Sequence, residues 1–347
     1  MDASRLLAAH AAASEFYRAR LAGHLPALAY LHSRGVSEAV AGAAPWLVGY
    51  APAGPQVLHD ALRAAGFGDR ELFDAGLVTT TRRGAVVDAF RDRVMFPVRD
   101  RAGRVVGFTG RDLSGRPGRP KYRNTVTTAI YRKKELLFGL AEQLPAAAVP
   151  DAVLVVEGPT DVLALACLRQ WLPAPPHVAV SPCGTALTAG QVALLREVVP
   201  AGTPIVVAFD ADGAGEGAAD RAYRLLRDWP GPVDALALPS GTDPAGLVAR
   251  FRHAAVPVLE AARRPLVEVI ADHVIERFRL DEVEGRVTAL RVVAPLVAEV
   301  AERDVRKAAA LSAHLVRRLR LDPLTVYEAA YPQRSVRSGR TARRTPG

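Results

Sequence analysis

Three acidic residues, Glu157, Asp210 and Asp212, follow short apolar runs that are typical of buried strands. Glu157 comes directly after VLVV, and the two aspartates, which are two positions apart, come after IVVAF. Residues two apart at a strand end face the same side, and the carboxyl ends of parallel strands meet at one edge of a sheet. Because clustered carboxylates repel one another unless a cation lies between them, the pattern predicts a Mg²⁺ site.

Two further acids are expected at the same edge. Asp161 lies four residues after Glu157, in the first turn of the next predicted helix, from where it could support the site without binding the ion directly. Asp243 lies in a loop that follows the fourth predicted strand. A single acid at such a place ordinarily caps a helix. Five acids that converge on one sheet edge favour a metal centre instead.

The elements that must position these acids alternate between strand and helix. We predict strands at 153–156, 177–181, 205–209 and 233–238, and helices at 161–170, 188–199 and 217–228. Helices of this length between strands indicate a parallel sheet with helices on both faces, which is an α/β fold. From about residue 244 to residue 330 the pattern predicts amphipathic helices and no strands.

The region before this alternation is mixed. The sequence predicts a helix from 6 to about 31, a second at 56–65, and a hairpin over 92–108 whose turn, 100–103, ends on a glycine. A basic loop at 113–120 and a linker at 145–151 follow. The expected organisation is a mixed α/β subdomain at 1–150, the parallel-sheet domain at 151–250, a helical subdomain at 251–330, and a disordered basic tail at 331–347.

Charge is unevenly distributed along the chain. Residues 82–134 contain fifteen Arg or Lys and four Asp, and residues 331–347 contain five Arg and no acid. Since the whole chain carries +9, the remaining residues together carry −7. A basic surface beside an acidic site suits a polyanion that passes metal ions, and nucleic acid is the expected partner. General arginine richness is the alternative explanation, but it would not leave the rest of the chain negative.

Several classes of protein are excluded. No apolar run approaches the roughly 18 residues that a spanning helix needs, and the N-terminus lacks the pattern of a secretory signal, so no membrane partner is expected. Cys167 and Cys183, the two cysteines, are too few for a disulfide framework or a cysteine-based zinc site. The glycines after Asp212 do not follow the dinucleotide-binding spacing, and no Walker A motif occurs. A reduced cytoplasmic protein is expected.

The chain resembles the catalytic core of bacterial DnaG-type DNA primases, whose central module is the Toprim domain that topoisomerases share. EGPTDV and FDADGAG match the Toprim glutamate and its later DxD pair. FRDRVMFPVRDRAGRVVGFTGRDL, PKYRNT and YRKKELLFGL resemble the segment specific to primases. YLHSRGVSEAVAGAAPWLVGYAP upstream, and SPCGTALTAGQVALL and LPSGTDPAGLV downstream, extend the similarity over roughly residues 15 to 325.

This resemblance implies a fold, an activity and a set of site residues. It places a Toprim parallel sheet after a primase-specific α/β subdomain and before a helical one, in a protein that acts at the nucleoid. It implies synthesis of short RNA primers from ribonucleoside triphosphates on single-stranded DNA with two Mg²⁺ or Mn²⁺ ions. The implied catalytic residues are Glu157, Asp210 and Asp212. The implied metal-binding residues are Glu157, Asp161, Asp210, Asp212 and Asp243, and the implied nucleotide- and template-binding residues are Arg34, Arg111, Lys121, Lys133 and Lys134.

The sequence departs from the family pattern in two respects. Where the family usually has DPD, this chain has Asp243, Pro244 and Ala245, so one acid near the second metal position is missing. The 347 residues also contain no counterpart of the family's zinc-binding module or of its full helicase-binding domain. We therefore expect no zinc, and we expect a replicative helicase or a separate zinc-binding protein to act in trans.

Two alternative functions stay open at this point. A Toprim nuclease would need the same metal ions and would cut a strand rather than extend one. A catalytically inactive nucleic-acid-binding accessory of a mobile element would need only the basic surface.

Overall fold

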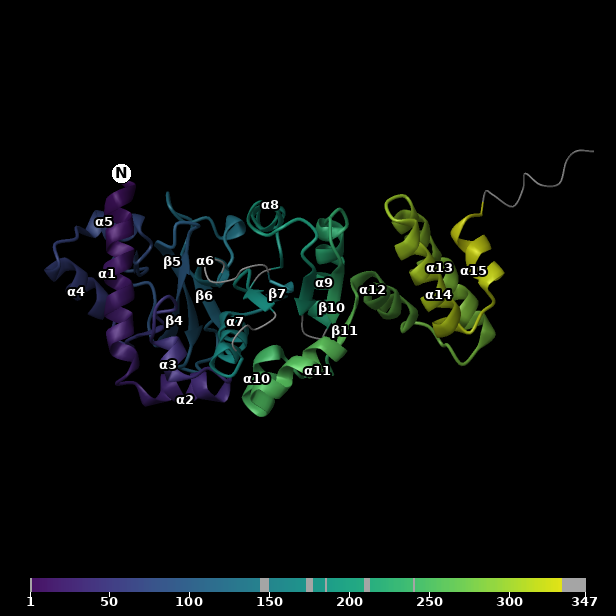
Figure 1. Cartoon of the computed structure of the whole chain (residues 1–347). Helices are drawn as coiled ribbons and strands as arrows, with labels where there is room; N and C mark the ends of the chain where they lie inside the picture. Colours follow the sequence, from purple (N-terminus) through teal and green to yellow (C-terminus); the bar gives the residue numbers. More distant parts are fainter. Residues whose placement is uncertain are drawn as a thin grey trace, which may run out of the picture. The chain divides into compact units, whose positions relative to one another are not determined.

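The computed structural model describes residues 2–143, 150–172, 177–184, 186–208, 213–239 and 241–332 (Figure 1). The chain forms two compact units, Met1–Arg263 and Arg264–Gly347. Across the described residues no helix has both the length and the apolar character that crossing a bilayer requires. The predicted tail at 331–347 lies, from residue 333 on, outside the described residues.

The first unit begins with helices around a small antiparallel sheet. The order of the strands in this sheet is β1-β4-β5-β6, and β2 and β3 form a separate two-stranded ribbon. Helix α1 runs alongside the sheet and packs against β1 and β5 (Figure 1). The elements are α1 (Ala3–Leu21), α2 (Leu25–Ser33), α3 (Glu38–Ala41), β1 (Gly49–Ala51), α4 (Val57–Ala64), α5 (Asp69–Asp74), β2 (Val78–Thr80), β3 (Val86–Asp88), β4 (Arg93–Arg99), β5 (Val105–Asp112), β6 (Tyr122–Asn124), η1 (Lys133–Glu135) and α6 (Leu140–Gln143).

Two sequence predictions can be checked in this region. The hairpin is confirmed, because β4 and β5 pair antiparallel and Gly103 in their turn has a φ of 77°. The single helix expected over 6–31 is wrong, because α1 ends at Leu21 and α2 starts at Leu25. His24 caps α2 by accepting the N–H of Ala27, and Pro26 lies in its first turn, where a proline starts a helix rather than continues one.

The second sheet of this unit is mostly parallel, as predicted. Its order is β11-β10-β9-β7-β8, and β7 pairs in parallel with both β8 and β9. All five residues of β7 are completely buried, which explains its unbroken apolar sequence. The elements are β7 (Ala152–Val156), α7 (Pro159–Ala166), η3 (Cys167–Gln170), β8 (His177–Val180), α8 (Ala189–Val198), β9 (Ile205–Ala208), α9 (Gly213–Leu226), β10 (Val233–Leu236), α10 (Pro244–Phe251), η4 (Arg252–Ala254), α11 (Ala255–Ala261) and β11 (Arg263–Pro265).

The expectation that strands end near residue 244 is wrong. After α11 the chain returns to the edge of the sheet, where the N–H of Ala237 donates to the carbonyl of Ala262 at 2.9 Å. Arg263, at the start of β11, forms an ion pair with Asp234 of β10 at 3.0 Å. Three residues are too few for an apolar period to appear, so this strand leaves no signal in the sequence.

After β11, the described part of the second unit is helical, up to residue 332. It consists of α12 (Leu266–Ile275), α13 (Val283–Ala301), α14 (Val305–Leu319) and α15 (Pro323–Ala330). Asp272 of α12 accepts hydrogen bonds from His314 at 2.8 Å and from Arg264 at 2.7 Å. Burial alone would raise the pKa of Asp272, but these two partners lower it to about 2. The pair of Asp272 and His314 links α12 to α14.

A buried acid in the first unit makes stability depend on pH. Burial raises the pKa of Glu142 to about 7, although the guanidinium of Arg99 lies 3.5 Å from its Oε1. The unfolded chain releases this proton near pH 4.5, whereas the folded chain retains it up to about pH 7. The free energy of unfolding should therefore fall as the pH rises through this window and stay low above it.

Glu142→Gln should remove this pH-dependent loss. At pH 8 we expect the variant to be more stable than the parent by about 1 to 3 kcal/mol, with little difference at pH 4.5. Urea unfolding at both pH values measures the difference. Glu135→Gln, at a nearby side chain that is 59% exposed, is the matched control and should change stability at neither pH. An equal effect of Glu142→Gln at both pH values would contradict the raised pKa of Glu142 as the source of the pH dependence.

Candidate functional site

A cavity of about 270 Å³ opens at the carboxyl edge of the parallel sheet. It is formed within the first unit by residues from α2, β5, β6, α7 and the start of α10. Six of the ten predicted site residues line it. These are Arg34, Arg111, Lys121, Glu157, Asp161 and Asp243.

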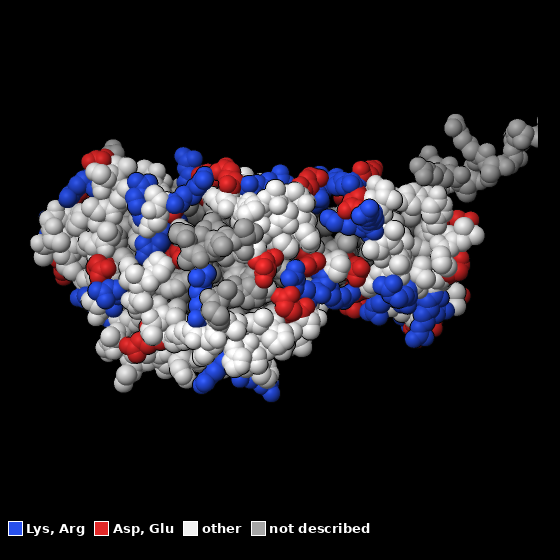
Figure 2. Space-filling model, viewed as in Figure 1, with Lys and Arg blue, Asp and Glu red and all other residues white. Residues whose placement is uncertain are grey.

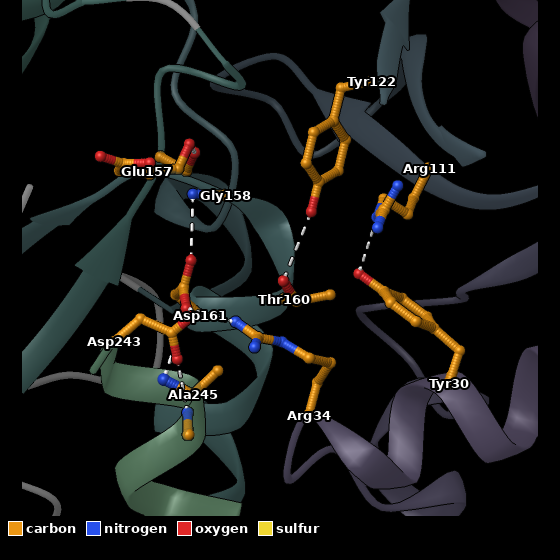
Figure 3. A network of polar contacts seen from close by, with 12 residues as sticks. Tyr30, Arg34, Arg111, Tyr122, Glu157, Gly158, Thr160, Asp161, Asp243 and Ala245 are labelled. Carbon is orange, nitrogen blue, oxygen red and sulfur yellow. Dashed lines mark hydrogen bonds and ion pairs between the residues drawn. The ribbon is translucent and has the colours of Figure 1, made fainter. Parts of the chain in front are cut away.

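Glu157 follows β7 directly, as the sequence predicts, and its residue is exposed at the cavity (Figure 3). The backbone here is held in place, because the carbonyl of Glu157 accepts a hydrogen bond from the hydroxyl of Ser181 at 2.8 Å. The strand end that carries this carboxylate therefore has a well-defined position. It also retains access to solvent and to ions.

Asp161 is buried, with 6% of its surface exposed. Its Oδ2 accepts the N–H of Gly158 at 3.2 Å and so caps α7. Its Oδ1 accepts the N–H of Ala245 at 3.3 Å and lies 3.5 Å from the guanidinium of Arg34 (Figure 3). Burial, together with the nearby charge of Asp243, raises the pKa of Asp161 to about 7. Asp161 therefore joins the starts of α7 and α10.

Asp243 caps α10. Its Oδ1 accepts the N–H of Gly246 at 2.7 Å, and its Oδ2 accepts from Arg34 at 2.5 Å. Arg34 lies just after α2, and its side chain is 29% exposed. Burial alone would lower the pKa of Arg34, but the ion pairs with Asp243 and Asp161 raise it. One arginine from the N-terminal region thus balances two acids of the parallel-sheet region.

Aromatic and basic side chains form the opposite wall of the cavity. The Nε of Arg111 donates to the hydroxyl of Tyr30 at 3.2 Å, and its guanidinium lies 5.4 Å from the Tyr30 ring and 5.5 Å from the Tyr122 ring. The hydroxyl of Tyr122 lies 3.5 Å from that of Thr160 (Figure 3). The two tyrosines hold Arg111 beside the cavity. Sequence analysis missed both, although they lie in motifs that it quoted, YLHSRG and PKYRNT.

Lys133 and Lys134 do not line this cavity. They form η1, and their backbone carbonyls accept hydrogen bonds from Gln191 at 3.2 Å and from Thr188 at 2.6 Å, at the start of α8. Burial lowers the pKa of Lys133. The binding role predicted for these two lysines stays a prediction.

Asp210 and Asp212 lie outside the described residues. The strand that precedes them is described, and its last residue, Ala208, lines the cavity. Among the residues that the structure describes, no three His, Cys, Asp or Glu side chains gather closely enough to hold a metal ion. The carboxylate oxygens of Glu157 and Asp243 are nevertheless metal ligands of the kind that Mg²⁺ and Mn²⁺ prefer. The described part of the site therefore fits a divalent ion in its chemistry.

Ala245 occupies the position where an acid was expected. Its side chain is completely buried in the core, and its N–H is the group that donates to Asp161. The backbone of this residue therefore contributes to the site, although its side chain does not.

A second cavity, of about 340 Å³, lies among the basic residues of the N-terminal region. Arg93 is 2% exposed and donates to the carbonyls of Gly110 at 2.9 Å and Pro120 at 3.0 Å. It therefore links the end of the basic loop at 113–120 to β5. The arginines that line this cavity are Arg91, Arg93, Arg116, Arg119 and Arg123. Figure 2 shows basic side chains spread over the visible surface, interspersed with acidic ones.

Comparison with known families gives two matches along the chain. Residues 16–144 match the model described as DNA primase catalytic core, N-terminal domain, and residues 154–248 match the model described as Toprim-like. The chain is 36% identical to the DNA primase of Streptomyces coelicolor over 301 residues, which are 85% of this chain and 46% of that protein. The chain spans about half the length of the curated relatives it matches.

Solved structures agree with these matches. The fold is similar to the RNA polymerase domain of Mycobacterium tuberculosis primase DnaG in complex with double-stranded DNA, with a TM-score of 0.76 and 34% identity. That similarity covers 92% of this chain and 98% of the other. A DnaG primase catalytic domain bound to ssDNA has a TM-score of 0.71 and 30% identity, over 92% and 98% of the two chains.

Proposed function

Since this chain belongs to the bacterial DnaG-type DNA primase family, we propose that it synthesises short RNA primers from ribonucleoside triphosphates on single-stranded DNA. One observation carries the proposal. Glu157 and Asp243 share a single cavity with Arg111 and Lys121, so acids suited to metal ions face cations suited to phosphates. A reaction that transfers a nucleotide from a triphosphate to a growing chain needs both kinds of group within one site.

The proposed roles follow from these positions. Glu157, with Asp210 and Asp212, would hold the divalent ions, and bound ions would neutralise the triphosphate and activate the attacking hydroxyl. Arg111 and Lys121 would bind the phosphates of the incoming nucleotide. Asp161 would act mainly by positioning, since its oxygens already accept backbone N–H groups of α7 and α10.

The template would pass over the second, arginine-lined cavity. Its residues belong to the basic segment that is expected to hold nucleic acid, and phosphate contacts by arginine supply most non-specific affinity.

We also propose a domain boundary near residue 150, because the two family matches end at 144 and begin at 154. The boundary near residue 250, the supply of helicase or zinc-binding functions in trans, and a location at the nucleoid stay predictions.

The role of the arginine-lined cavity can be tested by binding. Arg116→Gln removes an exposed cation from this cavity. We expect about threefold weaker binding of single-stranded DNA, and a slope of log K against log salt that is shallower by about 0.7. Fluorescence anisotropy over a series of salt concentrations measures both. Arg70→Gln, at an 84% exposed side chain outside both cavities, is the control and should change neither.

The proposed activity is tested by product analysis. The protein is incubated with single-stranded DNA, labelled ribonucleoside triphosphates and Mg²⁺ or Mn²⁺, and Asp210→Ala/Asp212→Ala serves as the blank for contaminating polymerases. Short labelled RNA that requires the template and is lost with a chelator supports the proposal. Cleavage of the template would favour a nuclease, and DNA binding without either product would favour an inactive accessory.

A further inference from the structure

The acid pair of Asp161 and Asp243 has a resident cation. Arg34 lies 127 residues from Asp161 and 209 residues from Asp243 in the sequence, yet its Nη2 lies 3.5 Å from the first and 2.5 Å from the second. Figure 3 shows its guanidinium directed at both carboxylates. The ion pairs therefore connect the end of α2 to the starts of α7 and α10.

All four carboxylate oxygens of this pair accept hydrogen bonds. Three of them accept backbone N–H groups at the starts of α7 and α10. The fourth, Oδ2 of Asp243, accepts from Arg34. Backbone donors are fixed by the helices to which they belong, whereas the arginine side chain is partly exposed at the cavity and can rotate away. Arg34 is therefore the donor that an incoming ion would displace.

The backbone next to Arg34 is tightly packed, which keeps the Cα of Arg34 beside the acid pair. Gly35 has a φ of 73°, and a Cβ at this position would lie 2.8 Å from the nitrogen of Ala249 and 3.2 Å from the carbonyl oxygen of Ala245. The chain after α2 thus lies against the backbone of α10, the helix that Asp243 caps. The backbone at Arg34 therefore stays beside the acids, and only a rotation of its side chain can move the guanidinium away from them.

We propose that Arg34 competes with a divalent metal ion for Asp243, so that an ion binds there only when Arg34 turns away. A nucleoside triphosphate in the same cavity would attract the released guanidinium. Metal and nucleotide would then favour each other's binding. A metal ion on Asp243 releases Arg34 for the phosphates of the nucleotide, and a nucleotide that holds Arg34 leaves Asp243 free for the metal ion. In this role Arg34 is a positioning residue and a gate. The inference rests on the proposed function, since it takes Asp243 to be a metal-binding residue.

Metal affinity tests this competition without measuring catalysis. Free and bound Mn²⁺ are quantified by electron paramagnetic resonance with the intact protein and with Arg34→Gln, Arg34→Lys and Arg111→Gln. Arg111→Gln removes an equal charge from the same cavity, but Arg111 contacts tyrosines rather than the acid pair. It therefore reports how much affinity changes merely because a nearby charge is lost.

We expect Arg34→Gln to bind the most weakly held Mn²⁺ about tenfold more tightly than the parent, because loss of one partly buried ion pair is worth about that factor. Arg111→Gln should change the affinity about threefold or less, and Arg34→Lys, which keeps the charge, about twofold or less. A non-hydrolysable triphosphate should tighten Mn²⁺ binding to the parent and have a smaller effect on Arg34→Gln.

The outcomes distinguish a failure of the proposed competition from a failure of the proposed metal site. If Mn²⁺ binds but Arg34→Gln binds it no more tightly than Arg111→Gln does, the competition is wrong and the proposed function stands. If neither the parent nor any variant binds Mn²⁺, the competition and the metal role of the site are both wrong. If Arg34→Gln does not fold, the guanidinium resonance of Arg34 in ¹⁵N-labelled parent protein, assigned with Arg34→Lys, decides. It must shift on Mg²⁺ addition, and an unchanged resonance would overturn the proposal.

Discussion

Glu157→Gln is expected to lower the rate of primer synthesis at least about 100-fold without unfolding the protein. The substitution keeps the size of the side chain but removes the charge that a divalent ion needs. Glu157 is exposed at the cavity, and its backbone carbonyl, which accepts from Ser181, is not altered. The initial rate of RNA formation at saturating Mg²⁺ and the midpoint of thermal unfolding are the two measurements.

Asp151→Asn is the matched control for this substitution. Asp151 is also an exposed acid next to β7, but it precedes the strand and does not line the cavity. We expect its activity to stay within about twofold of the parent, as for a surface position away from the site. If Glu157→Gln retains more than about a tenth of the parent activity, the assignment of Glu157 to the metal centre is wrong.

Gly35→Ala is expected to destabilise the first unit by about 3 kcal/mol and to remove most of the activity. Two effects add. The positive φ of 73° disfavours any side chain, and the new Cβ would lie only 2.8 Å from the backbone nitrogen of Ala249. Either α2 or α10 must then move, and with it the contact of Arg34 with Asp243. Urea unfolding measures the first effect, and primer synthesis measures the second.

Gly66→Ala separates conformational strain from the close contact. Gly66 has a φ of 86°, but a Cβ there would have no atom within 4 Å. This variant should therefore lose only about 1 to 2 kcal/mol, the cost of the backbone conformation, and should keep its activity. Equal losses of stability in the two variants would show that the packing of Gly35 against α10 contributes nothing.

The sequence alone predicts most of the parallel sheet and one half of the site. The apolar run of β7 followed by Glu157 predicts both the strand and the position of the acid, because a strand buried on both faces is unmistakably apolar. The β4–β5 hairpin is also predicted, since a turn glycine between two apolar runs is a local signal. The resemblance to primase motifs then links Arg111 and Lys121 to the same site, and both line the cavity.

Other features depend on contacts between distant segments. The break between α1 and α2 was missed, because alanine-rich helical sequence continues across it and only the caps mark the boundary. The short β11 was missed because its place is set by the edge of β10, with which the returning chain forms hydrogen bonds. Neither feature has a periodic pattern of its own.

The acid cluster shows the same division. Residue types and spacing place Glu157, Asp161 and Asp243 at one sheet edge, because strand direction and helix starts are local properties. Which acid is exposed and which is already paired is a property of the packed chain. Asp161 is enclosed by the starts of α7 and α10, and Asp243 is paired with an arginine 209 residues away. Burial and partners of this kind arise only when α2 and α10 pack together, so the tertiary structure alone assigns them.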